Sequence, residues 1–359
     1  MMGELMQPGG RLLLSKLGLQ DCLEGIDAQV STGLAIYKDG NEAVASYPVE
    51  DKNFPYEPSA RTFHNGRFVQ RLRQKASSLP NVRLEEGTVK SLIEEKGVIK
   101  GVTYKNSAGE ETTALAPLTV VCDGCYSNLR RSVNHNIVPP KLRKIFLKGI
   151  DEGENIKAMP TKRVEATLSE KKGVIVLGDA FNMRHPAIAS GMMVLLSDIL
   201  ILRDLLQPLR NFGDANKVSE VIKSFYVIRK PMSAMVNTLG NAFSQALIAS
   251  SDEAKEAMRQ GCYDYLSSGG FRTSSMMALL GGMNPRPISL IYHLCAITLS
   301  SIGQLLSPFP SPLRAWHSLR LFGLSMQMLV LHLKVEGIQM LSSANAAAYR
   351  KNYMAATAL

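Results

Sequence analysis

The chain has little cysteine, no apolar signal segment at its start and no partner for its single CxxC motif. Its five cysteines are an odd number and lie far apart, which argues against a scaffold built on disulfides. A reducing compartment is therefore expected. Cys122 and Cys125 form the CxxC motif, but no second CxxC or histidine pair completes a zinc site, so no metal is predicted.

What the chain does have is apolar residues and positive charge. Hydrophobic residues make up 45% of the 359 positions, enough to bury one large core or two smaller ones. The formal net charge of +10 would suit nucleic acid or an anionic lipid surface. The segment from Pro285 to Leu359, the most apolar part of the chain, contains six basic residues and one acidic residue, Glu336. This position favours a membrane surface over a polynucleotide, and no nucleic-acid partner is expected.

In the N-terminal third, the spacing of apolar residues predicts short helices followed by strands. Apolar residues from Leu12 to Leu17 indicate a brief helix, and residues 65–78 predict a longer one that Pro80 ends. Three β-rich runs follow, separated by turn signals, and they predict a three-stranded antiparallel meander. These runs are Val89–Ile93, Val98–Tyr104 and Leu118–Val121.

Two continuously apolar runs have the pattern of strands covered on both faces. The run ending at Cys122 is followed by Asp123-Gly124, and the run Val174–Leu177 is followed by Gly178-Asp179. Ligands of open α/β sheets bind at the carboxyl ends of such strands, so both dipeptides are candidate site residues.

The rest of the chain predicts helices. After Pro186 the apolar positions step by four and three up to Pro208, which predicts a long helix with a core-facing stripe. A mainly helical region over 218–283 is expected to break at Pro231 and at Gly269-Gly270. The predicted stripe consists of Ile188, Met192, Leu195, Ile199, Leu202 and Leu206.

Two uncharged runs near the C-terminus predict a helical hairpin. Residues 288–306 are about long enough to cross a bilayer, whereas 321–333 are too short. A proline-rich turn over 308–312 separates them, with Trp316 nearby at what could be headgroup level. A hairpin that dips into one leaflet is favoured over a two-pass anchor, and a helix pair buried in a soluble core is the remaining alternative.

The segment from Gly178 to Pro186 carries the most informative chemistry. An aspartate at this strand end can accept hydrogen bonds from a ribityl hydroxyl, and the N-terminus of the following helix presents free N–H groups. Negative charge develops on the pyrimidine ring of a reduced flavin, and residues 189–192 let the backbone come close to it. The same strand-Gly-Asp-loop-helix pattern also occurs as plain structure.

Longer strings of residues resemble one family. The sequences GVIVLGDAFNMRHP (173–186), SFYVIRKPMSAMVNTL (224–239), LLSPFPSP (305–312) and NAAAYRKNY (345–353) are similar to plant squalene epoxidases, and the similarity covers nearly the whole chain. The resemblance implies an α/β (α+β) fold: an FAD-dependent monooxygenase with a glutathione-reductase-like FAD domain and a C-terminal helical, membrane-associated region.

The resemblance also implies a cofactor, partners and site residues. The cofactor would be FAD, with electrons from an NADPH-dependent flavoprotein reductase, and the reaction would convert squalene and O2 to 2,3-oxidosqualene at the cytosolic face of the endoplasmic reticulum membrane. No catalytic side chain is expected, since the reduced flavin supplies the oxygen chemistry. Gln7 matches a polar residue of the substrate pocket. The positions that match FAD contacts are Arg73, Val89, Asp179 and Met192.

The chain departs from the family pattern at two places. It contains no GxGxxG, and Asp123 and Asp179 are only 56 positions apart, so part of the substrate-domain sheet is expected to be missing at a joint near 132–140. The expected division is an incomplete FAD-binding domain over 1–208, a helical region over 209–285 and membrane-associated helices over 286–359. A catalytically inactive membrane protein derived from the family and a flavin monooxygenase acting on another lipid remain alternatives.

Overall fold

The computed structural model describes residues 3–39, 41–49, 51, 54–124, 127, 129, 164, 166, 171–247, 252–307 and 309–336. These residues form two compact units that are interleaved along the chain. Unit 1 comprises 1–82, 186–201 and 227–359, and unit 2 comprises 83–185 and 202–226. The predicted joint near 132–140 lies outside the described residues, and the predicted three-part division stays a prediction.

Unit 1 begins with strands and short helices. The strands order as β1-β5-β2 in one antiparallel sheet, and β3 pairs with β4 in a hairpin. The sequence predicted α1 and α2 correctly, because both carry apolar residues at helical spacing. The elements are β1 (Gly3–Met6), α1 (Pro8–Lys16), η1 (Gln20–Leu23), β2 (Gln29–Ser31), β3 (Gly33–Lys38), β4 (Asn41–Ser46), β5 (Ala60–His64) and α2 (Asn65–Ser77).

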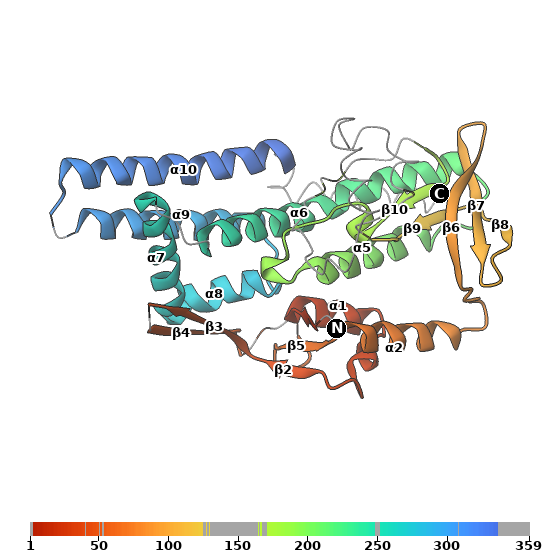
Figure 1. Cartoon of the computed structure of the whole chain (residues 1–359), viewed down its shortest axis with the longest axis horizontal. Helices are drawn as coiled ribbons and strands as arrows, with labels where there is room; N and C mark the ends of the chain where they lie inside the picture. Colours follow the sequence, from red (N-terminus) through yellow and green to blue (C-terminus); the bar gives the residue numbers. More distant parts are fainter. Residues whose placement is uncertain are drawn as a thin grey trace. The chain divides into compact units, whose positions relative to one another are not determined.

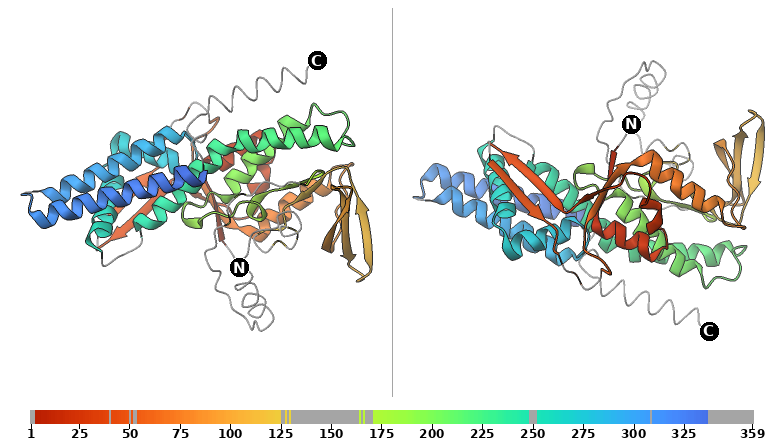
Figure 2. Two further views of the ribbon diagram at one scale, coloured as in Figure 1. Left: turned by 90° about the horizontal axis from the view of Figure 1, so that it is seen from above. Right: turned by 90° about the horizontal axis from the view of Figure 1, so that it is seen from below.

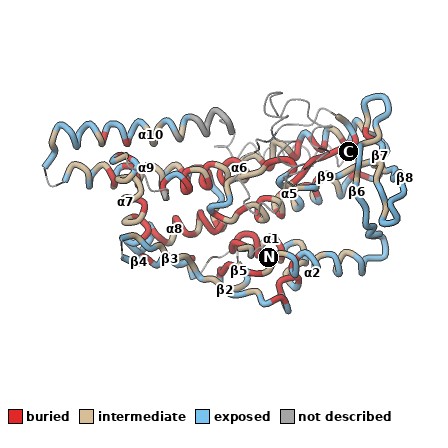
Figure 3. Tube along the Cα trace, in the orientation of Figure 1, coloured by how far each residue is buried: buried red, intermediate tan, exposed pale blue. Residues whose placement is uncertain are grey.

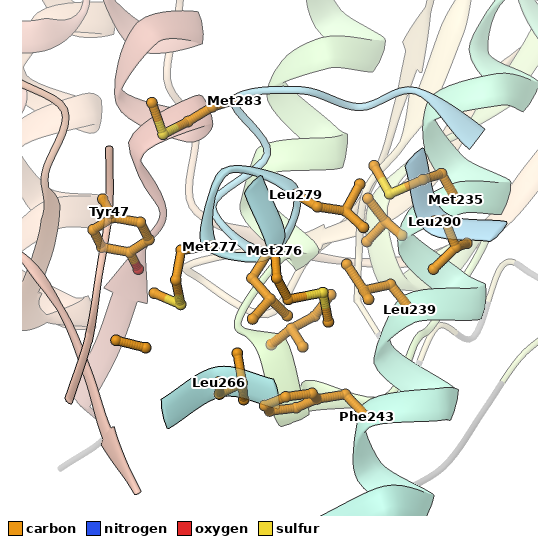
Figure 4. Packing of buried hydrophobic residues seen from close by; sticks show 14 of the residues in the cluster. Tyr47, Met235, Leu239, Phe243, Leu266, Met276, Met277, Leu279, Met283 and Leu290 are labelled. Atoms are coloured by element: carbon orange, nitrogen blue, oxygen red, sulfur yellow. The ribbon is translucent and has the colours of Figure 1, made fainter. Parts of the chain in front are cut away.

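The helices of unit 1 enclose its main core. Buried Met, Leu and Phe side chains from α6 and α8 pack with Tyr47, as Figure 4 shows for Met235, Leu239, Phe243 and Met277. Helices α9 and α10 run side by side as a hairpin (Figure 1), and the two further views agree (Figure 2). The helices are α5 (Gly191–Leu206), α6 (Ala215–Leu247), α7 (Glu253–Ser267), α8 (Gly270–Leu280), α9 (Pro287–Leu306) and α10 (Pro312–Glu336); short turns η2 (Gly178–Ala180) and η3 (Pro186–Ile188) precede α5. The end of α5 from residue 202, the part of α6 up to residue 226 and η2 belong to unit 2.

Unit 2 contains two small sheets. An antiparallel sheet orders as β6-β7-β8, and β9 pairs with β10 in parallel. Residues from both sheets and from η2 share one hydrophobic cluster that includes Ile99, Val121 and Val176. The strands are β6 (Gly87–Glu95), β7 (Val98–Asn106), β8 (Glu111–Leu115), β9 (Thr119–Val121) and β10 (Val174–Val176).

Two sequence predictions were wrong in detail. The third meander strand is β8, which sequence reasoning missed because all five of its residues are exposed and show no apolar alternation. The run at 118–121 instead forms β9. Helix α6 is 33 residues long and continues through Pro231, where a break was predicted. The proline ring removes one backbone hydrogen bond, but buried side chains on both sides of it pack against the core and keep the helix continuous.

The predicted stripe on α5 was only partly right. Ile188 and Leu202 are buried as predicted, but Ile199 is 37% exposed. Met193, Val194 and Leu196, which the stripe left out, are buried as well. A helix that is apolar on most sides can bury more than one face, so spacing alone does not identify the buried one. The predicted break at Gly269-Gly270 is confirmed: both glycines have positive φ, and α8 begins there.

Candidate functional site

The two predicted strand ends lie at one edge of one sheet. Strands β9 and β10 are parallel neighbours, with Val121 opposite Val176, and the Leu177 N–H donates to the Val121 carbonyl at 2.9 Å. Asp123-Gly124 and Gly178-Asp179 follow these strands directly. The parallel pairing of these two strands therefore places both dipeptides where α/β proteins bind ligands.

The Gly178-Asp179 turn has a fixed backbone. The N–H groups of Phe181 and Asn182 both donate to the Gly178 carbonyl, at 3.0 and 2.9 Å, and Gly178 itself has a φ of 61°. Ala180 and Phe181 are buried beside the turn, and the Phe181 ring packs on Tyr226 with centroids 5.4 Å apart. Asp179 itself is exposed, so the turn presents its carboxylate to solvent at the sheet edge.

Residues 188–191, here called the α5 entry turn, lead into α5. Ala189 has a φ of 46°, a conformation that is costly for a residue with a side chain. Ser190 is only 1% exposed, and its hydroxyl has no hydrogen-bond partner among the described residues. A Cβ added to Gly191 would meet no described heavy atom within 4 Å. A strained backbone, an unsatisfied buried hydroxyl and open space thus coincide at the first N–H groups of a helix.

Gln7 holds the α5 entry turn in place. Its amide Nε2 donates to the Ile188 carbonyl at 2.8 Å, and its Oε1 accepts from the Tyr47 hydroxyl at 2.8 Å. Gln7 is 5% exposed, and burial raises the pKa of Tyr47 to about 12, so this hydroxyl remains a donor at physiological pH. The structure therefore shows Gln7 supporting the turn; its predicted place in a substrate pocket stays a prediction.

A buried ion pair anchors α5 further along. The Arg229 guanidinium donates to both carboxylate oxygens of Asp198, at 2.9 and 2.8 Å, and the two side chains are 4% and 3% exposed. The pair fixes α5 against α6. Neither Asp198 nor Arg229 had been predicted as important, because a charged pair buried between two helices leaves no local sequence signal.

The four predicted cofactor residues belong to two regions of the molecule. Two of them, Val89 and Met192, pack against different hydrophobic clusters. Val89 packs against the hydrophobic cluster that contains Ala180 and Phe181, the neighbours of Asp179. Met192 packs against another cluster, which also receives Leu72, the neighbour of exposed Arg73. The structure thus associates Val89 with the Gly178-Asp179 turn and Met192 with helix α2. Their contacts to a cofactor stay predictions.

Each unit, taken by itself, offers groups that fit a part of FAD. In unit 1, the α5 entry turn offers the first N–H groups of a helix, the Ser190 hydroxyl and open space beside Gly191, which suit the electron-rich edge of a flavin. In unit 2, the exposed Asp179 carboxylate can accept a hydrogen bond from a hydroxyl group such as those of a ribityl chain. The sequence offers no GxGxxG loop for the pyrophosphate.

Comparisons with solved structures define the class of fold. A p-nitrophenol 4-monooxygenase from Pseudomonas putida matches with a TM-score of 0.57 and 15% identity, over 78% of this chain and 90% of that one. A flavin-dependent brominase matches with a TM-score of 0.54 and 12% identity, over 79% and 84%. The chain has the fold of the FAD-dependent monooxygenases.

Sequence comparisons define the family. The squalene epoxidase family model matches residues 115–138 and 135–316. Squalene epoxidase 5 of Arabidopsis thaliana is 71% identical over 432 aligned positions, which cover 100% of this chain and 84% of that protein. Squalene monooxygenase 1,1 of Brassica napus is 69% identical, with 100% and 83% covered. The chain belongs to the squalene epoxidase family.

The same comparisons locate a difference from the relatives. The Arabidopsis alignment extends over 432 positions against 359 residues here, which leaves at least 73 positions without a counterpart in this chain. The two matches of the family model meet at residues 135–138, within the joint that the sequence predicts.

Proposed function

We propose that the chain is an FAD-dependent squalene epoxidase that converts squalene to (S)-2,3-oxidosqualene. One atom of O2 enters the terminal alkene and the other leaves as water, with two electrons supplied by NADPH through a flavoprotein reductase. The observation that carries the proposal is the 71% identity to a squalene epoxidase over the whole chain. The geometry of the α5 entry turn supports it independently.

Bound FAD would supply the reduced flavin that activates O2. In this proposal the chain's own residues bind and orient it. In unit 2, considered by itself, Asp179 would accept a hydrogen bond from a ribityl hydroxyl. In unit 1, the N–H groups at the start of α5 and the Ser190 hydroxyl would donate hydrogen bonds to the pyrimidine edge, where negative charge develops. Gln7 keeps these donors in position through the Ile188 carbonyl. Arg73, Val89 and Met192 remain the further candidate contacts.

The α9–α10 hairpin supports a membrane location. Among the described helices, α9 alone has the length and apolarity of a membrane span, with 20 residues and a mean hydropathy of 1.4 over its most apolar window. Large apolar side chains are exposed on both helices, including Ile288, Leu299, Trp316 and Leu319. Figure 3 shows that much of the α10 trace is exposed. Such a surface fits insertion into one leaflet, at the cytosolic face of the endoplasmic reticulum, where an apolar substrate dissolves.

The test is turnover by the full chain. Purified protein, incubated with FAD, NADPH, a reductase and vesicles that contain squalene, is expected to form 2,3-oxidosqualene, detected by mass spectrometry. Asp179→Ala is expected to weaken FAD binding by roughly 10- to 100-fold, since it removes a charge-assisted hydrogen bond. Asp204→Ala, on the far end of α5, is the matched control and should bind FAD normally.

A chain that retains no flavin and forms no product would contradict the proposal. That result would favour the alternative that the chain is a catalytically inactive membrane protein derived from the family. The observation behind this alternative is that at least 73 positions of the alignment have no counterpart in this chain. A chain that retains flavin but oxidises a different lipid would identify a monooxygenase with another substrate.

A further inference from the structure

Two arginines of unit 1 lie together without an acidic partner. Arg11 of α1 and Arg61 of β5 both donate to the Ser59 hydroxyl, at 2.6 and 3.3 Å. Arg11 is only 6% exposed, and Arg61 is half-buried. The ion pairs between arginines and carboxylates within the described part of the chain involve other arginines. The two positive charges are therefore not neutralised by a described side chain.

The third member of the group is Tyr56. Its ring lies under the Arg11 guanidinium, whose central carbon is 4.4 Å from the ring centroid. Burial raises the pKa of Tyr56, although the nearby charges of Arg11 and Arg61 oppose the rise. The hydroxyl therefore stays protonated at physiological pH and supplies no negative charge. We call Arg11, Arg61 and Tyr56 the arginine cluster.

The arginine cluster has more hydrogen-bond donors than acceptors. Arg11 Nη1 also donates to the Ser59 carbonyl at 2.9 Å, and Arg61 Nη1 donates to the Ala60 carbonyl at 3.3 Å. Arg11 Nε and the Tyr56 hydroxyl are buried and have no hydrogen-bond partner among the described residues. A guanidinium can only donate, so two arginines cannot satisfy each other. The unused donors of the cluster are the groups that an anion binds.

Burial makes this arrangement costly for the chain alone. Desolvation and then the positive charge of Arg61 lower the pKa of Arg11, which shows that the charged form is disfavoured. The Tyr56 ring offsets part of this cost through its negative face, but it carries no full charge. An unpaired buried charge is strongly destabilising, and a second like charge adds repulsion. One anion between the two guanidinium groups would remove both penalties.

The surroundings favour a small ion. Arg11 Nε and the Tyr56 hydroxyl are enclosed by protein, so a ligand with a bulky organic group does not reach them. Arg61 and Tyr56 are half-buried, so the arginine cluster borders solvent on their side. A carboxylate or phosphate needs two aligned donors for its strongest contacts, whereas a monatomic anion accepts hydrogen bonds from any direction.

We propose that the arginine cluster binds one small inorganic anion of the size of chloride. The ion accepts hydrogen bonds from Arg11 Nε and the Tyr56 hydroxyl and neutralises the charge that Arg11 shares with Arg61. The Arg11 N–H donates to the Gln7 carbonyl at 3.1 Å, so the ion stabilises α1 at the end that carries Gln7. The binding needs no flavin and no lipid.

Chloride titration of the full chain tests the proposal. Chloride replaces gluconate, a bulky anion, at constant ionic strength while thermal unfolding is followed. Between about 1 mM and about 200 mM chloride, the unfolding midpoint should rise by roughly 2 to 4 °C, because an ion that binds only the folded chain stabilises it. Broadening of the chloride NMR signal by the folded chain measures binding directly.

Two variants separate the arginine cluster from general salt effects. Arg11→Met removes one guanidinium of the cluster and keeps a long side chain, whereas Arg71→Met removes an exposed arginine of α2. Arg11→Met is expected to lose both the chloride-dependent rise and the broadening, and Arg71→Met is expected to keep them. Arg61→Met replaces Arg11→Met in the comparison if the latter does not fold.

Two results would overturn the proposal. One is an unaltered chain whose unfolding midpoint and chloride signal do not respond to chloride, including the case in which only phosphate stabilises it. The other is an equal chloride response in Arg71→Met and in the folded variant of the arginine cluster. FAD binding takes no part in either measurement, so this proposal and the proposed function fail separately.

Discussion

The α5 entry turn and the α6–α10 pocket, a small apolar space lined by Phe243, Met276 and Leu294 among others, lie in the same unit but hold their side chains in opposite ways. At the turn, the hydrogen bond from Gln7 to the Ile188 carbonyl supports the residues that lead to Ala189 and Ser190. In the pocket, apolar side chains form most of the wall, and the Thr298 and Ser325 hydroxyls bond to each other. The difference teaches that a turn which presents donors needs directional support, whereas an apolar wall needs only adaptable packing. Substitutions should therefore be costly in the first region and mild in the second.

The largest expected effect is at the ion pair that anchors α5. Arg229→Met leaves the Asp198 carboxylate buried without its cation, so the free energy of unfolding should fall by about 3 to 5 kcal/mol. Arg203→Met, which breaks an exposed pair with Asp204, should cost less than about 1 kcal/mol. Denaturant unfolding of the two variants measures both values. If the two variants lose similar amounts of unfolding free energy, burial does not set the contribution of the Asp198–Arg229 pair to stability.

The next effect is alkaline destabilisation through Tyr47. Burial raises its pKa to about 12 in the folded chain, against 10.0 for the free side chain. The stability this shift contributes is complete below pH 10 and is lost as pH rises toward 12, by at most about 3 kcal/mol. The difference in unfolding free energy between the unaltered chain and Tyr47→Phe should therefore narrow over this window. A constant difference would mean that Tyr47 ionises normally.

A smaller effect is expected at Gln7. Gln7→Leu leaves the Ile188 carbonyl and the Tyr47 hydroxyl without their partner, at a cost of about 2 kcal/mol, and should weaken FAD binding as the turn relaxes. Tyr47→Phe keeps the bond from Gln7 to Ile188 and should retain FAD. Flavin titration alongside thermal unfolding separates these outcomes. If both variants bind FAD equally well, Gln7 does not position the turn.

The smallest effect is expected in the α6–α10 pocket. Leu294→Met conserves volume in an adaptable wall, so the free energy of unfolding should change by less than about 1.5 kcal/mol. Chemical denaturation checks the value. A loss as large as that of Gln7→Leu would contradict the contrast between the two regions.

The sequence predicted the parts of the fold that local patterns encode. Continuous apolar runs predicted β9 and β10, and helical spacing predicted α2. Strand β8 was missed because it is exposed, and α6 was wrongly broken at Pro231 because packing from distant residues holds that helix together. Among site residues, Gly178-Asp179 was recognisable from strand and turn signals. Tyr47, Asp198 and Arg229 were not, since each acts through a partner on another element.

The central claim is that a flavin lies in the open space beside Gly191, and FAD titration of two matched variants tests it most directly. At Gly191 and at Gly303 alike, an added Cβ meets no described atom within 4 Å, so the Cβ of a valine fits at either position. The account predicts that the unaltered chain and Gly303→Val bind FAD, whereas Gly191→Val loses at least tenfold in affinity. Equal FAD binding by all three proteins, or none by the unaltered chain, would contradict it.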